Sequence, residues 1–319
     1  MIRAAIRLVA LGLIVAAVAR RWRRSKEQPE RRKRSMAYPQ TTLEEVVESE
    51  RAMFFDGAAR YGQHYKHARN VTMYLSLCVV SVDYDRSDTF GRFLSLMKKQ
   101  HMLAFLSALR LHKVQAMLNL RQVLEAGAGA AYAIANPNIR DFADIDAFGI
   151  MDPSQKLAGK RYRWLRENYP EASKRIEDIK KEINDQNAHA NIVSADATFR
   201  VGHTKDIVDL PFFDVEDEYF VKADLWRISS AAITLMDLFY GVTESVARAT
   251  GRSVLEFRPD FPNAIEGLVA KSNALQREII GSDRYKAAMR KEQQRTKAKA
   301  KLDAEARSKT PRPPTSARR

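Results

Sequence analysis

The chain has 319 residues, of which 45% are hydrophobic, so it is long and apolar enough to bury a sizeable core. Its net charge of +15 is unevenly spread: residues 1–35 carry 11 Lys/Arg and 2 Asp/Glu, residues 281–319 carry 13 and 4, and residues 36–280 carry 30 and 33. A near-neutral body argues against a basic nucleic-acid groove within it. The single cysteine, Cys78, excludes an intrachain disulfide and a thiolate metal site, and is typical of a reducing compartment.

The first 35 residues combine a hydrophobic segment with a basic linker. Twelve uncharged residues, Leu8–Ala19, would rise about 18 Å as a helix, against roughly 30 Å of bilayer hydrocarbon. We favour a short single-pass anchor in the inner membrane, because the Lys/Arg excess after it places the body in the cytoplasm. Two alternatives stay open: translation that starts at Met36, which would give a cytoplasmic protein, and an export signal cleaved after Ala17–Val18–Ala19.

The two basic ends, residues 1–35 and 281–319, have the charge needed to attract anionic lipid or to bind nucleic acid without sequence specificity. Residues 286–309 have helical propensity without an apolar face, and residues 310–319 have the composition of a disordered tail. The sequence predicts neither a protein partner nor an oligomeric state.

Residues 36–280 are expected to form one all-α domain, a bundle of long antiparallel helices. Thr41 or Thr42 caps the first helix, in which apolar side chains from Phe54 to Leu75 recur on one face. A second helical pattern covers residues 89–136 and is expected to bend near His112 before Pro137 closes it. Further helices are expected over residues 156–169, 171–194, 215–250 and 262–280, and a small β-hairpin over residues 197–213.

The strongest local anomaly lies in the second pattern, where residues 123–135 are small or apolar on every helix face. Such a helix is buried all round. Arg121 and Glu125 stand one turn apart at its entrance, and Tyr132 lies further along the same face. We favour a structural Arg121–Glu125 ion pair over a polar ligand pocket between helices, because structural ion pairs are common.

A second anomaly is NDQNAHAN, residues 184–191. Helical spacing puts Asn187 on the same stripe as Ile183, so its amide needs hydrogen bonds in the core. His189 lies beside Glu182 and Asp185 if the helix stays regular, and a kink would turn it inward. We expect the inward position, towards Arg121 and Glu125, with Asn187 and Tyr132 as candidate ligand-binding residues.

The pieces LRQVLEAGAGAAYAI and INDQNAHANIVS together resemble a group of bacterial all-helical domains of unknown function, over about residues 115–240. They are also similar to the HEPN ribonucleases, all-helical domains that cleave RNA without a metal through an arginine and a histidine about five residues apart. The second resemblance implies His189 as general acid/base and Arg121 as the group that stabilises phosphate charge, with Glu125 beside them. The sequence departs from that pattern before His189, where the nearest basic residues are Lys181 and Lys180.

A formal match to the HEPN spacing occurs earlier, at Arg60 and His67. Asp56, Arg60, His64 and His67 share one helix face away from the apolar stripe, so we interpret them as a solvated polar face. His64 and His67 lack a third metal ligand nearby, and the sequence indicates no metal site and no cofactor.

These observations favour a membrane-tethered binding or interaction module over an enzyme. The alternative is a HEPN-like metal-independent ribonuclease or nucleotide-processing domain that uses His189 and Arg121.

Overall fold

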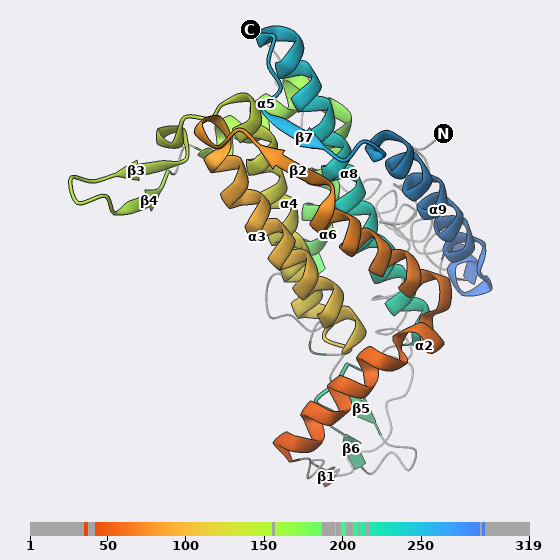
Figure 1. Ribbon diagram of the computed structural model, residues 1–319. Coiled ribbons are helices and arrows are strands. Elements are labelled where there is room, and N and C mark those ends of the chain that lie inside the picture. Colours follow the sequence, from red (N-terminus) through yellow and green to blue (C-terminus); the bar gives the residue numbers. More distant parts are fainter. Residues whose placement is uncertain are drawn as a thin grey trace, which may run out of the picture. The chain divides into compact units, whose positions relative to one another are not determined.

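The computed structural model describes residues 35–37, 42–154, 157–186, 195, 199–201, 207–209, 211–214, 217–287 and 289–290 (Figure 1). The chain divides into two units, residues 31–279 and a second unit of residues 1–30 with 280–319. The predicted all-α bundle with a small β insertion is confirmed. Its described α-helices are α2 (Leu43–Leu77), α3 (Tyr84–Leu109), α4 (Lys113–Ala135), α5 (Leu157–Asn168), α6 (Pro170–Gln186), α8 (Glu218–Thr250) and α9 (Phe261–Gly281).

Helix α2 begins where the sequence predicted. Thr42 accepts a hydrogen bond from the backbone of Glu45, and the Glu45 carboxylate accepts one from the backbone of Thr42, which forms a capping box. Gly62 then interrupts the helix with φ +53° and ψ −122°. This left-handed φ is readily adopted only by glycine, so Gly62 fixes the position of a kink that changes the phase of every later side chain.

The expectation of one bent helix over residues 89–136 is wrong: the chain reverses completely between α3 and α4, which pack side by side (Figure 1). Leu111 takes φ +59° in the turn. The turn is held from elsewhere in the chain, because Arg110 and His112 both bind Glu50 of α2, and the Asp214 carboxylate accepts from the backbone of Lys113 at 2.6 Å. None of these partners is near the turn in sequence, so local pattern could not reveal the reversal.

The structure also contains short paired strands. The predicted hairpin contains β5 (Arg200–Val201) antiparallel to β6 (Ile207–Asp209), and β6 also pairs with β1 (Ser35–Ala37). Two further pairs were not predicted: β2 (Val79–Val82) with β7 (Leu255–Phe257), and β3 (Ala143–Ile145) with β4 (Met151–Pro153). The β2–β7 pair joins the end of α2 to the segment that leads into α9.

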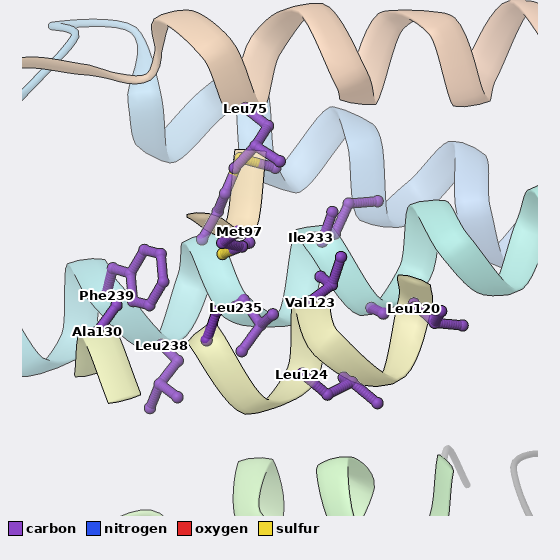
Figure 2. Packing of buried hydrophobic residues seen from close by; sticks show 14 of the residues in the cluster. Leu75, Met97, Leu120, Val123, Leu124, Ala130, Ile233, Leu235, Leu238 and Phe239 are labelled. Carbon is purple, nitrogen blue, oxygen red and sulfur yellow. The ribbon is translucent and has the colours of Figure 1, made fainter. Parts of the chain in front are cut away.

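Helix α4 packs against α3, α5, α6 and α8, as its all-round apolar pattern predicted. The absence of a side chain at Gly127 lets Leu235 of α8 approach so closely that a Cβ atom built there would lie 2.5 Å from Leu235 Cδ1. Figure 2 shows Val123, Leu235 and Phe239 in the resulting layer between α4 and α8. Glycine and alanine in α4 therefore serve close helix packing.

Residues 1–34 and 291–319 lie outside the described residues, and so do the anchor and the basic tail predicted there. Among the helices that are described, none has the length and hydropathy of a membrane span.

Candidate functional site

Five side chains from three helices meet where α4, α5 and α6 adjoin. They form what we call the Glu125 cluster: Arg121, Glu125, Arg161, Tyr162 and Lys180. Arg121 Nε donates to Glu125 Oε1 at 3.2 Å, and Lys180 Nζ lies 3.0 Å from the same oxygen. Lys180 also donates to the Tyr162 hydroxyl at 2.6 Å and lies 4.4 Å from the centre of that ring. The predicted Arg121–Glu125 pair therefore exists, with a second cation on its carboxylate.

Arg161 is the most buried cation of the cluster, with 8% of its surface exposed. Its Nη1 donates at 3.0 Å to the backbone carbonyl of Glu125, and its guanidinium lies 4.8 Å from the centre of the Tyr162 ring. Its Nε is buried and finds no hydrogen-bond acceptor in the part of the chain that the structure describes. A buried N–H without an acceptor costs about 1–3 kcal/mol, so this donor is a place where an additional acceptor would be stabilising.

Glu125 is held in its ionised form. Its partial burial raises the carboxyl pKa, but the hydrogen bond and charge of Lys180, and then those of Arg121, outweigh this effect and lower the pKa. Glu125 therefore contributes a permanent negative charge near neutral pH. The cluster remains partly open to solvent, because the side chains of Arg121 and Glu125 keep 34% and 27% of their surface exposed.

A second polar network, which we call the Arg227 network, lies nearby where α4, α6 and α8 meet. It contains Lys113, Glu182, Asp224 and Arg227. Arg227 Nη2 donates to Glu182 Oε1 at 2.9 Å, and Arg227 Nη1 donates to Asp224 Oδ1 at 3.4 Å. Lys113 Nζ lies 3.8 Å from Asp224 Oδ2. Deep burial raises the pKa of Glu182, against the opposing charge and hydrogen bond of Arg227.

The Glu125 cluster and the Arg227 network differ in charge balance and in solvent exposure. The Arg227 network matches two cations with two carboxylates, and its Arg227 and Glu182 side chains are at most 9% exposed. The Glu125 cluster matches three cations with a single carboxylate, counting the described side chains named above, and is partly exposed to solvent. A buried network in which positive and negative charges balance fits a structural role. Surplus positive charge at a solvent-accessible position favours the binding of an anionic ligand.

The remaining predicted site residues are only partly described. Tyr132 is buried, and its ring packs at 5.6 Å from both Phe142 and Trp164, within an aromatic group at the far end of α4. Asn187 and His189 lie outside the described residues. The inward position of His189, its proximity to Arg121, and the ribonuclease role that depends on it therefore stay predictions.

The interpretation of Asp56, Arg60, His64 and His67 as a solvated face is wrong for the two histidines, which are 2% and 3% exposed. The kink at Gly62 separates the two histidines from Asp56 and Arg60. A single helical wheel therefore does not give the side-chain directions on both sides of Gly62. Helix α9 also packs over this part of α2, since His64 hydrogen-bonds to the backbone of Leu275. Arg60 stays on the other side of the kink, where its guanidinium lies 5.3 Å from the centre of the Tyr61 ring.

Sequence reasoning missed Lys180, Arg161 and Tyr162 as members of the Glu125 cluster, because they lie 36–55 positions from Glu125 and nothing local links them to it. Arg227 could have been found. It interrupts a long apolar stretch of α8, with Asp224 one turn before it, which is the same signal that drew attention to Arg121 and Glu125.

No three His, Cys, Asp or Glu side chains among the described residues are grouped so that they could hold a metal ion. Fold and cluster together define an all-helical bundle protein with a cation-rich polar site between its helices. Comparisons with protein-family models, with curated proteins and with solved structures find no match for this chain.

Proposed function

We propose that this chain is a helical-bundle binding module, and that the Glu125 cluster is its binding site for an anionic small molecule. The observation that carries the proposal is the surplus of cations around Glu125. Arg121, Arg161 and Lys180 come from three different helices and are held in place by one carboxylate, one phenol and one backbone carbonyl. An anion that enters this site meets positive charge that is already positioned.

The class of anion follows from the donors. Arg121 and Arg161 offer planar guanidinium groups that suit carboxylate and phosphate oxygens, and Lys180 adds a compact charge with a hydroxyl beside it. Each of these groups donates hydrogen bonds to oxygen, and the aromatic ring of Tyr162 lies against two of the cations. We therefore expect a phosphate- or carboxylate-bearing ligand.

The predicted membrane anchor in residues 1–35 belongs to the same proposal. A tether at the cytoplasmic face of the inner membrane would hold the binding module near that surface, and the basic ends would add attraction to anionic lipid. This part of the proposal is supported by the sequence pattern of the ends and by their charge.

A thermal-shift panel on the full chain tests the binding site. Inorganic phosphate, sulfate, citrate, a nucleoside monophosphate and a nucleoside triphosphate are compared at physiological salt. A ligand present at ten times its dissociation constant stabilises the folded state by about 1.4 kcal/mol, which raises the melting temperature by a few degrees.

Lys180→Met removes the central cation, and Lys174→Met is its matched control. Lys174 lies on the same helix, is 57% exposed, and contacts only the surface carboxylate of Asp178 among the described residues. The proposal predicts that at least one anion of the panel stabilises the wild type and Lys174→Met equally, and Lys180→Met much less. Equal shifts in all three chains would assign the binding to the basic ends and overturn the proposed site.

A further inference from the structure

The seam between α2, α8 and α9 buries two histidines that the proposed binding site does not use. His64 and His67 lie one turn apart on α2 after the Gly62 kink, and α9 covers them. His64 hydrogen-bonds to the backbone of Leu275, and this bond favours the charged ring, so the ring donates. The other ring nitrogen, Nε2, is then the acceptor in the neutral ring.

The imidazole rings are poorly satisfied for buried groups. His64 Nε2 and both ring nitrogens of His67 have no hydrogen-bond partner among the described residues, and the same holds for Nε2 of the buried Gln276 on α9. No carboxylate within the described seam accepts a hydrogen bond from either ring. A protonated ring here would carry charge without a hydrogen-bonded counter-ion among the described residues, which is a costly state for a buried side chain.

Two lysines and one glutamate act on this pair through their charges. Lys271 of α9 acts against protonation of both histidines, Lys222 of α8 acts against protonation of His64, and His64 acts against protonation of His67. Glu278 of α9 is the one acidic group that acts on His64 in favour of the charged form, and it is exposed. Proton uptake would therefore place new positive charge between cations carried by the two neighbouring helices.

The two ends of α9 are held differently. Its first residue, Phe261, is 1% exposed and packs among aromatic rings: its ring centre lies 4.6 Å from that of Phe257, 5.1 Å from Tyr240 and 6.1 Å from Tyr74. Strand β7 precedes it and pairs with β2. The later part of α9, from Lys271 onward, is the part that covers the histidines, so protonation would act on one half of the helix.

We propose that His64 and His67 form an acid-sensitive latch, which holds residues 271–279 of α9 against α2 while both rings are neutral and releases them when the rings take up protons. The aromatic anchor at Phe261 stays in place during release. Release exposes the two histidines of α2 to solvent. Helices α3, α4 and α8 stay folded, because only the later part of α9 moves.

The pH range follows from the histidines. Desolvation lowers the pKa of both rings, and the pKa of His67 falls from 6.5 to about 4. A group with a depressed pKa stabilises the docked helix fully above pH 6.5, and that stabilisation is lost as the pH falls towards 4. For His67 alone, these values predict that the equilibrium constant for opening rises about thirtyfold between pH 8 and pH 5.

Hydrogen–deuterium exchange of the full chain, corrected for the intrinsic pH dependence of amide exchange, tests the latch. Between pH 8 and pH 5 the opening equilibrium of peptides within residues 271–279 is expected to rise at least thirtyfold, while peptides within residues 123–134 and 259–266 keep their protection. A uniform loss of protection across all three regions would mean ordinary acid unfolding and would overturn the proposal.

Two variants assign the effect to the pair. His64→Leu/His67→Leu removes both titrating groups and is expected to keep residues 271–279 protected at pH 5. Lys271→Glu, an exposed position that should not impair folding, is expected to shift release to lower pH because it removes a charge that opposes protonation.

His101→Leu is the control. His101 is also buried, but it lies on α3 and bonds Thr72 of α2 at 3.0 Å, so the acid response of α9 should persist in that chain. An acid response of α9 that is unchanged in both Lys271→Glu and His64→Leu/His67→Leu would refute the latch.

Discussion

Lys180 Nζ lies 3.0 Å from Glu125 Oε1 and joins α6 to the centre of α4 through a carboxylate that Arg121 also contacts. The same ammonium donates to Tyr162 of α5. One lysine therefore links three helices at a position where positive charge exceeds negative charge. The Glu125 carboxylate keeps the cations in place. It also neutralises part of their charge, which weakens their attraction for an anionic ligand.

Replacement of Glu125 by glutamine should destabilise the fold in a pH-dependent way. The wild-type carboxylate has a lowered pKa, so its stabilising effect is complete above the ordinary value of 4.5 and is lost as the pH falls below it. We expect Glu125→Gln to lower the free energy of unfolding by about 1–3 kcal/mol at pH 7, because the partly buried donors Lys180 and Arg121 lose a charged acceptor. Urea unfolding followed by circular dichroism should show this gap narrowing below pH 4.5. A gap that widens in acid would contradict the ionised pair.

The Arg227 network should behave as a structural unit. Arg227→Met leaves Glu182 buried beside no guanidinium, and removal of one member of a buried ion pair costs about 3–5 kcal/mol. Arg227→Met/Glu182→Met removes both charges and should recover at least half of that loss. Chemical denaturation of the three chains measures the coupling. If the double variant is no more stable than Arg227→Met, the two side chains are not energetically paired.

Close packing between α4 and α8 depends on Gly127. Gly127→Ala would place a Cβ atom 2.5 Å from Leu235 Cδ1, so we expect a loss of about 1–3 kcal/mol from overpacking. Gly91→Ala on α3 is the matched control: its Cβ atom would meet nothing within 4 Å, and alanine in a helix interior should stabilise by about 0.5–1 kcal/mol. Thermal unfolding of both chains should therefore shift in opposite directions. The same direction of shift in both would mean that α4 and α8 do not approach so closely.

The sequence predicted the helical class, a cap at Thr41 or Thr42, the buried α4 and the Arg121–Glu125 pair, because each depends on side chains within one or two helical turns. It failed where distant residues decide the outcome. The reversal at Leu111 is held by Glu50 and Asp214, and the burial of the histidines is caused by α9.

The kink at Gly62 shows the limit of helical periodicity. A single residue with φ +53° changes which side chains face inward, and a wheel drawn through it assigns the later positions to the wrong face. The Arg227 network, in contrast, carried a readable signal, since charged residues within the apolar stretch of α8 require partners.

Titration calorimetry with the anion that gives the largest thermal shift tests whether this anion binds at the Glu125 cluster. The full-length wild type, Lys180→Met and Glu125→Gln are compared at physiological salt, where the basic ends contribute equally to all three. Loss of a cation should weaken binding about tenfold, and loss of the resident carboxylate should strengthen it by a similar factor. Affinity is expected to rise in the order Lys180→Met, wild type, Glu125→Gln. Three indistinguishable dissociation constants would show that the anion does not bind at Glu125.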